Sequence, residues 1–154
     1  MASVKNLFLF SCLISIGAYA CPELSAQYAN CKSPRGTGST SSNMVITQST
    51  SNNVTSYQMA FTNDETQSRS EQTLVGDHTP RKTSQTDPIT GVVYDTFTTT
   101  HCEDDVLVVT TDLQMGGKPF GHLVISMYRL DEGMMQSMEG ELFGKPVSQS
   151  LICR

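Results

Sequence analysis

The 154-residue sequence has few basic residues and no basic cluster. Lys and Arg number 10 against 15 Asp and Glu, which gives a formal net charge of −5. Nucleic-acid binding and electrostatic docking on anionic lipid both need concentrated positive charge. We therefore expect neither nucleic acid nor an electrostatically attracted membrane surface as a partner.

Sequence signatures of catalysis and metal binding are missing as well. The chain contains no Cys-x-x-Cys, Gly-x-Ser-x-Gly, His-Glu-x-x-His or phosphate-binding loop. The denser polar and sulfur clusters have structural explanations. Residues 101–105 predict a polar turn that holds a disulfide, the methionines of residues 127–138 predict core filling, and Glu139 and Glu141 predict a solvated strand face. We predict a non-enzymatic protein without cofactor, metal ligands or catalytic residues.

Long hydrophobic runs are limited to one, at the start of the chain. Residues 7–17 carry no charge, follow Lys5, and lead into Ala18-Tyr19-Ala20 before Cys21. A basic start, a short apolar run and an Ala-x-Ala site are typical of a cleaved secretory signal, and the run is shorter than the roughly 20 residues that span a bilayer. We predict a signal peptide at 1–20 and one domain at 21–154, secreted or periplasmic, without an integral membrane segment.

Four cysteines remain after removal of the signal, which indicates two disulfides in an exported chain. They are Cys21, Cys31, Cys102 and Cys153. Cys21 follows small residues and resembles the acylated cysteine of bacterial lipoproteins. Acylation would leave an odd thiol in an oxidising compartment, so we predict an unacylated Cys21.

Period-two alternation with β-branched and aromatic residues recurs along residues 21–154, whereas helical patterning is nearly absent. Residues 76–88, with Pro80 and Pro88, predict a crossover or rim loop. The tail 147–153 is either a ninth strand or a continuation of the eighth. The predicted strands are 24–31, 43–49, 54–62, 69–75, 91–101, 105–114, 121–130 and 134–143.

Short connections between these strands carry hairpin residues, for example residues 115–119 and 131–133. Several strands combine one apolar face with one Thr/Ser face, which suits a single sheet curled around its own core. We predict an all-β fold, an up-and-down antiparallel meander closing into an eight-stranded barrel; a β-sandwich is the alternative.

The stretch Leu24-Ser-Ala-Gln-Tyr28, followed by a meander, resembles the opening strand of lipocalin-like (calycin) proteins and of small exported proteins of Gram-negative bacteria. The resemblance covers the topology and this one strand. It implies a cavity for a small apolar ligand.

Strand geometry restricts the disulfide pairing. An extended run from Cys21 to Cys31 would separate the two by roughly 30 Å at about 3.3 Å per residue, so they do not pair with each other. Alternate strands of a meander end at the same rim, which predicts Cys31 with Cys102. If the tail extends the eighth strand, Cys21 pairs with Cys153, whereas a ninth strand would move Cys153 to the other rim.

The predicted function is that of an exported, non-enzymatic binding protein for a small hydrophobic ligand or lipid. An eight-stranded barrel is a size that just encloses one small ligand. The alternative is an exported interaction module, adhesin-like or inhibitor-like, that binds a protein or surface partner through its Ser/Thr face or the 76–88 loop. An interior filled by side chains would favour the alternative. The residues predicted to line a ligand cavity are Tyr28, Phe61, Phe97, Ile125 and Met127.

Overall fold

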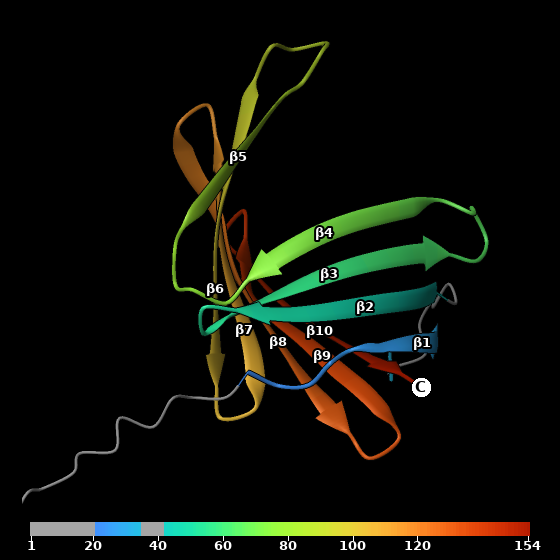
Figure 1. Cartoon of the computed structure of the whole chain (residues 1–154). Coiled ribbons are helices and arrows are strands. Elements are labelled where there is room, and N and C mark those ends of the chain that lie inside the picture. Colours follow the sequence, from blue (N-terminus) through green and yellow to red (C-terminus); the bar gives the residue numbers. More distant parts are fainter. Residues whose placement is uncertain (1–20, 35–41) are drawn as a thin grey trace, which may run out of the picture.

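The computed structural model describes residues 21–34 and 42–154; the predicted signal peptide lies outside them. Within the described residues the chain forms ten β-strands and no helix, which confirms the all-β prediction (Figure 1). The strands are β1 (Ala26–Cys31), β2 (Ser42–Ser51), β3 (Val54–Asn63), β4 (Arg69–Val75), β5 (Arg81–Thr86), β6 (Val93–Glu103), β7 (Val106–Met115), β8 (Lys118–Leu130), β9 (Gly133–Leu142) and β10 (Lys145–Cys153).

The ten strands pair into two antiparallel sheets. A four-stranded sheet has the order β1-β2-β3-β4, and a six-stranded sheet has the order β10-β9-β8-β7-β6-β5. Neighbours in each sheet are consecutive in the chain, so the predicted antiparallel meander is confirmed. The strands do not form the single closed barrel of eight, because the described strands separate into two sheets that face each other and cross at a steep angle (Figure 1).

The two sheets meet along a short seam between β1 and β10. Lys32 pairs with Ile152 in an isolated antiparallel bridge, and Ala29 and Arg154 exchange two backbone hydrogen bonds. At the other side the chain passes from β4 to β5 through residues 76–80. The sheets are therefore held together at one pair of edges, and at the other pair they are connected by the linker.

Side chains fill the space between the sheets. Two buried tyrosines satisfy their hydroxyl groups there: Tyr57 donates to the Pro22 carbonyl at 2.8 Å, and Tyr28 donates to the Leu24 carbonyl at 2.9 Å. Buried hydroxyl groups need such partners. The largest fully buried side chains come from both sheets and from the segment before β1: Tyr57, Leu24, Met44, Leu107, Met134 and Val109.

Both disulfides form, but with partners other than those predicted. Cys21 bonds to Cys102, and Cys31 bonds to Cys153. The predicted pairs Cys31–Cys102 and Cys21–Cys153 are wrong because the tail turns back at residues 142–145 and forms a strand of its own, β10. The turn moves Cys153 to the end of the sheet where β1 terminates.

The second departure from the sequence prediction is β5, which lies inside the stretch predicted to be a loop. Its sequence, Arg-Lys-Thr-Ser-Gln-Thr, has no apolar residue and gives no alternation signal. The strand lies at the edge of the six-stranded sheet, where five of its six residues are exposed. An exposed edge strand needs no apolar face, and its charges protect that edge from unwanted pairing.

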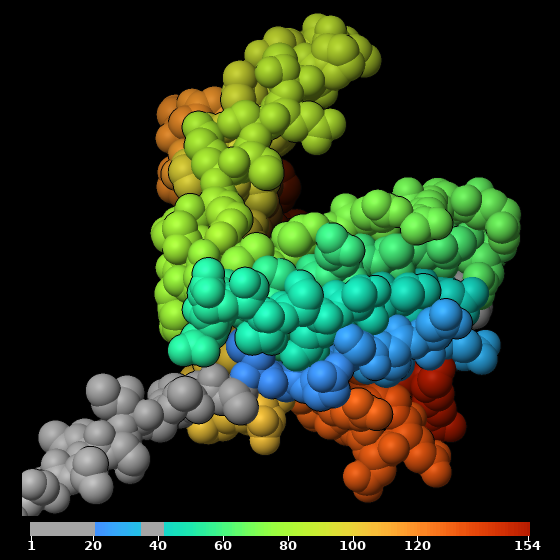
Figure 2. Space-filling model, viewed as in Figure 1, coloured from blue at the N-terminus to red at the C-terminus, as the bar shows by residue number. Residues whose placement is uncertain are grey.

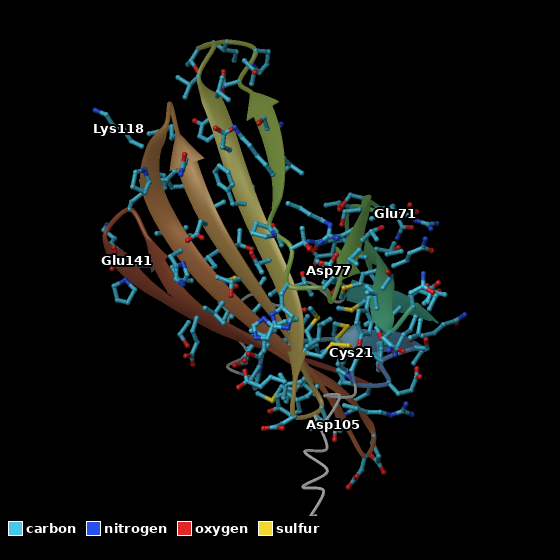
Figure 3. The ribbon with its side chains drawn as sticks, turned by 60° about the vertical axis from the view of Figure 1, so that its left-hand side comes forward. Cys21, Glu71, Asp77, Asp105, Lys118 and Glu141 are labelled. Atoms are coloured by element: carbon cyan, nitrogen blue, oxygen red, sulfur yellow. A yellow bond between two sulfur atoms is a disulfide. The ribbon has the colours of Figure 1, made fainter. Side chains whose placement is uncertain are left out.

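The six-stranded sheet extends beyond the four-stranded sheet at one end. That end carries the β5–β6, β7–β8 and β9–β10 turns, and Figures 1 and 2 show the β5–β6 hairpin standing clear of β4. In Figure 3, Lys118 and Asp105 mark the two ends of this sheet, and the four-stranded sheet that carries Glu71 covers only part of its length. The core-facing side of the six-stranded sheet is therefore only partly covered.

Candidate functional site

An apolar surface, here called the shelf, continues the core beyond the four-stranded sheet. Directly paired residues of antiparallel strands share a face, so the pairs Val109–Ile125 and Ile125–Met138 mark the core-facing side. The same side carries four further apolar side chains that, like Met138, are only half-buried: Leu113, Leu123, Leu142 and Val147.

A glycine forms the floor of the shelf. Gly121 pairs with Leu113 on one side and with Leu142 on the other. A Cβ atom added at Gly121 would lie 2.5 Å from Cδ2 of Leu142 and 3.2 Å from Cδ1 of Leu113. The two leucines therefore close over the glycine, which makes the apolar surface continuous across three strands.

The free end of the six-stranded sheet displays most of the exposed apolar side chains. Ile89 in the β5–β6 turn is 92% exposed, and Phe143 in the β9–β10 turn is 65% exposed. Phe120 stacks on Phe143 with ring centroids 4.8 Å apart, and Tyr94 meets Phe120 edge-on. With Met115 in β7, these side chains form the hairpin tip: Ile89, Val93, Tyr94, Met115, Phe120 and Phe143.

Threonines border the shelf on the side of β5. Thr96 pairs with Thr83 and with Leu113, and Thr98 pairs with Thr111. Their hydroxyl groups lie on the same face as the leucines. The shelf therefore combines an apolar floor with hydrogen-bonding groups at one margin, as ligand sites commonly do.

The opposite face of the six-stranded sheet carries charged groups on β5, β6, β7 and β8. Lys82 forms an ion pair with Asp95 at 3.0 Å and lies 5.4 Å from the ring centre of Phe97. A hydrogen bond from Ser84, together with one from Lys82, lowers the pKa of Asp95 below its usual value. His122 and Asp112 are joined at 2.7 Å on the same face, well exposed to solvent. Among residues 21–34 and 42–154, no hydroxyl or thiol nucleophile is hydrogen-bonded to this pair.

The linker between the sheets is fixed by an ion pair. Asp77, which Figure 3 places between the two sheets, accepts two hydrogen bonds from the Arg81 guanidinium at 2.8 and 2.7 Å. These bonds, followed by the one from the Thr79 backbone amide, hold the pKa of Asp77 well below its usual range. His78 stacks on His101 with ring centroids 4.8 Å apart, which packs the linker against β6. The linker is thus part of the folded structure.

A second concavity lies on the outer face of the four-stranded sheet. Its volume is about 350 Å³. Val45 and its strand partner Ala60 form the apolar floor, and Arg69 is paired with Glu71 at the margin. Its lining consists of Asn43, Val45, Thr47, Gln58, Met59, Ala60, Thr62, Arg69, Glu71, Gln72 and Thr73.

Four of the five predicted cavity residues are brought together, but in packed core. Tyr28 and Met127 are buried, and Phe61 and Ile125 pack against the same core cluster. Phe97 lies on the other face of its strand, beside Lys82. The bond between Cys102 and Cys21 turns the even-numbered residues of β6 toward the core, and Phe97 therefore points away from it.

The shelf residues themselves were not predicted from sequence. The sequence predicts strands with one apolar face, but nothing in their residues distinguishes the covered from the uncovered half of such a face. The length of strand that overhangs the four-stranded sheet depends on how the two sheets cross. Sequence alternation reports a face and carries no information about that crossing.

In the described part of the chain, no group of three or more His, Cys, Asp or Glu side chains is arranged to hold a metal ion. Within the same residues, no helix is long and apolar enough to cross a membrane. Comparisons with family models, with curated proteins and with solved structures gave no match.

Proposed function

We propose that this protein is an exported, non-enzymatic binding protein that takes a small hydrophobic molecule or lipid chain on the shelf. The observation that carries the proposal is the half-buried apolar row of Leu113, Leu123, Met138, Leu142 and Val147, which continues the core face without a covering element among the described residues.

The proposal moves the ligand from the interior predicted from sequence to the open side of the fold. Tyr28 and Met127 are buried among other side chains, and the Tyr28 hydroxyl is already satisfied by Leu24. A ligand could enter there only by displacing packed core. On the shelf, the ligand would complete the cover that the short four-stranded sheet leaves open, in a meander that curls like a barrel without closing.

The chemistry of the shelf favours an extended apolar ligand. Each methylene removed from water contributes about 0.8 kcal/mol, so a chain that buries six of them gains roughly 5 kcal/mol before the entropy of binding is subtracted. Thr98 and Thr111 at the margin can hydrogen-bond a polar head group. A fatty acid or a single acyl chain fits these two features.

The disulfides support an extracytoplasmic site of action. Cys21–Cys102 and Cys31–Cys153 indicate folding in an oxidising environment. Together with the predicted signal peptide at 1–20, they support a secreted or periplasmic carrier or scavenger of apolar molecules.

The test is to purify the protein from its native compartment, extract it with organic solvent, and titrate the extracted protein with an environment-sensitive fluorescent fatty acid. We expect an extractable apolar compound and saturable probe binding. Leu123→Gln and Met138→Gln should each weaken probe binding roughly tenfold, because each removes apolar contact with the chain.

The control for this experiment is Val45→Gln. Val45, like the shelf residues, is an apolar residue within a strand, and it is 42% exposed. It lies on the four-stranded sheet, away from the shelf. Unfolding in urea verifies that all variants are folded. Absence of both an extractable compound and saturable probe binding would contradict the proposal.

The interior filled by side chains and the concavity on the four-stranded sheet both support a second candidate, the interaction module. Its margin offers amide, hydroxyl and charged groups beside the β4 edge, a combination that suits an extended polypeptide. Crosslinking in the native compartment through a photoreactive residue at Thr73 would test it. A protein adduct formed at Thr73 and not at Thr110, on the outer face of the other sheet, would favour this candidate.

A further inference from the structure

The hairpin tip carries five of the six large hydrophobic side chains that are exposed among the described residues. They are Ile89, Val93, Tyr94, Met115 and Phe143; Val45 is the sixth. The five side chains come from the neighbourhoods of three different turns at one end of the six-stranded sheet. Exposed apolar groups concentrated in this way mark an interaction surface.

The turn that presents Ile89 is internally braced. The Asp87 carboxylate accepts hydrogen bonds from the backbone amides of Ile89 and Thr90 at 2.8 and 2.7 Å. The Gly91 amide donates to the Asp87 carbonyl at 2.9 Å. Ile89 is therefore held out into solvent by a fixed turn, and it does not fold back onto the sheet.

The shape of the hairpin tip favours a partner whose surface is deformable over a folded protein with a fixed surface. The apolar groups lie on protruding turns, as Figures 1 and 2 show for the β5–β6 hairpin. A folded protein would need a matching recess for each turn, whereas a bilayer accommodates any side chain that reaches the boundary between head groups and acyl chains. Phe and Tyr side chains are favoured at that boundary.

The charge of the tip is complementary to lipid head groups. Lys118 and Lys145 are the first residues of β8 and β10, directly after the β7–β8 and β9–β10 turns, and Figure 3 shows Lys118 at one end of the sheet. In residues 87–92, 115–118 and 142–145 the only acid is Asp87. These turns carry a net charge of +1, while residues 21–154 carry −6. The tip is thus a local exception to the expectation, drawn from the charge of the whole chain, that anionic lipid does not attract this protein.

We propose that the hairpin tip docks on the surface of a lipid bilayer, with Ile89 and Phe143 inserted below the head groups and Lys118 and Lys145 at the level of the phosphates. The shelf lies toward the same end of the sheet, so docking would place the shelf close to the membrane. The docking itself does not depend on the proposed ligand site. The Cys21 sulfur is bonded to Cys102, so the proposed contact does not involve a thioether-linked lipid on Cys21.

Sedimentation with lipid vesicles tests the proposal. The oxidised protein is mixed with vesicles of phosphatidylcholine alone, or of phosphatidylcholine and phosphatidylglycerol, and the bound fraction is measured. We expect binding to both, tighter to the anionic vesicles. Ile89→Ser and Phe143→Ser should each weaken binding roughly tenfold, as expected for one large apolar side chain. Val45→Ser, the matched control, should bind like wild type.

The lysines have a separate expected effect. Lys118→Gln and Lys145→Gln should each reduce binding to anionic vesicles about fivefold and leave binding to phosphatidylcholine unchanged. This difference separates electrostatic from apolar contact. A wild-type protein that stays in the supernatant with both vesicles, or a folded Ile89→Ser/Phe143→Ser variant that sediments like wild type, would overturn the proposal.

The absence of tryptophan supplies an independent measurement. Ile89→Trp introduces a single indole at the hairpin tip, and Val45→Trp introduces one on the outer face of the four-stranded sheet. Vesicles should shift the emission of the Ile89→Trp protein to shorter wavelength and leave that of Val45→Trp unchanged. Equal or absent shifts in the two proteins would contradict membrane docking, whatever the fluorescent fatty-acid titration shows.

Discussion

Tyr57 joins the core to the segment before β1. Its side chain is fully buried, and its hydroxyl donates to the Pro22 carbonyl at 2.8 Å. Burial, with a smaller effect of Glu23, raises the pKa of the Tyr57 hydroxyl far above its usual value. The protonated form is thus favoured in the folded state, and its contribution to stability is lost as the pH rises above about 10.

The first prediction concerns Tyr57→Phe. The variant should lose about 1 kcal/mol of unfolding free energy at neutral pH, because one buried hydrogen bond is removed. It should also lose stability less steeply than wild type as the pH rises above about 10. Urea unfolding as a function of pH measures both effects, with Tyr94→Phe at the exposed tip as control. If the unfolding free energies of Tyr57→Phe and wild type fell equally steeply above about pH 10, folding would not raise the pKa of the Tyr57 hydroxyl.

Asp77 makes the opposite contribution at acid pH. The Arg81 guanidinium, followed by the Thr79 amide, lowers its pKa in the folded state. The ionised form is thus favoured by folding, and the stability it contributes is present above pH 4 or so and is lost as the pH falls. The exposure of the group makes the effect small and sensitive to salt.

The second prediction is that Asp77→Asn destabilises the protein at neutral pH and that the difference from wild type shrinks as the pH falls below about 4. Asp131→Asn, in the turn between β8 and β9, is the control. Chemical denaturation at several pH values measures the difference. If the gap between Asp77→Asn and wild type stayed constant down to pH 2 or so, the contribution of Asp77 would not depend on its charge.

At the scale of elements, the turn between β8 and β9 depends on a glycine. Gly133 has a φ of +134°, and a Cβ atom there would lie 2.0 Å from the carbonyl oxygen of Cys153 on β10. A side chain at Gly133 would push the end of β10 away from β9. The neighbouring disulfide and the seam with β1 would move with it.

The third prediction compares Gly133→Ala with Gly116→Ala. Gly116 also has a positive φ, of +58°, but open space surrounds its Cβ position. Gly116→Ala should lose only about 1 kcal/mol for the backbone conformation. Gly133→Ala should lose roughly 2–4 kcal/mol, because the clash with backbone is added. Equal losses in thermal or urea unfolding would show that the β8–β9 turn can move away from Cys153.

Sequence patterning predicted most elements because their alternation is dictated by one buried face. The alternation predicts eight strands to within a few residues. It allows the tail to be either a separate strand or a continuation of the eighth, and the separate strand is correct. β5 is not predicted from the sequence, because an exposed edge strand has no buried face and therefore shows no apolar alternation. Because the tail forms a separate strand, Cys153 bonds to Cys31, whereas the predicted pairing with Cys21 required a tail that extends the eighth strand.

At the scale of the whole molecule, the two disulfides close long loops and tie the sheets together. Cys21–Cys102 fastens the segment before β1 to β6, and Cys31–Cys153 fastens β1 to β10 at the seam. The sequence separations are 81 and 122 residues. Long loops lose much conformational freedom in the unfolded chain when they are closed.

The fourth prediction is that replacing either pair by alanines costs about 2–4 kcal/mol of unfolding free energy. The Cys31→Ala/Cys153→Ala variant should lose more, because Cys31 and Cys153 are both almost completely buried at the seam, whereas Cys21 in the other pair is only half-buried. Urea unfolding of the two variants against the oxidised wild type measures this order. A larger loss for Cys21→Ala/Cys102→Ala would show that the β1–β10 seam holds without its disulfide.

The candidate site depends on how the two sheets are placed relative to each other in the whole molecule, and the sequence pattern does not specify that placement. Each shelf residue occupies an ordinary core-facing position of its strand, and the site exists only because the four-stranded sheet ends before the six-stranded sheet does. Phe97 shows the same dependence on the whole fold: the disulfide between Cys102 and Cys21 fixes which face of β6 turns toward the core, and Phe97 lies on the other face.

The measurement that tests the ligand site most directly is amide chemical-shift mapping of the isotope-labelled protein during titration with a medium-chain fatty acid. A ligand bound on the shelf should produce saturable shifts at the amides of Leu123, Gly140 and Leu142, and none at Leu107 in the packed core. Shifts confined to Ala60 and Glu71 on the four-stranded sheet, or no saturable shift at any amide, would contradict it.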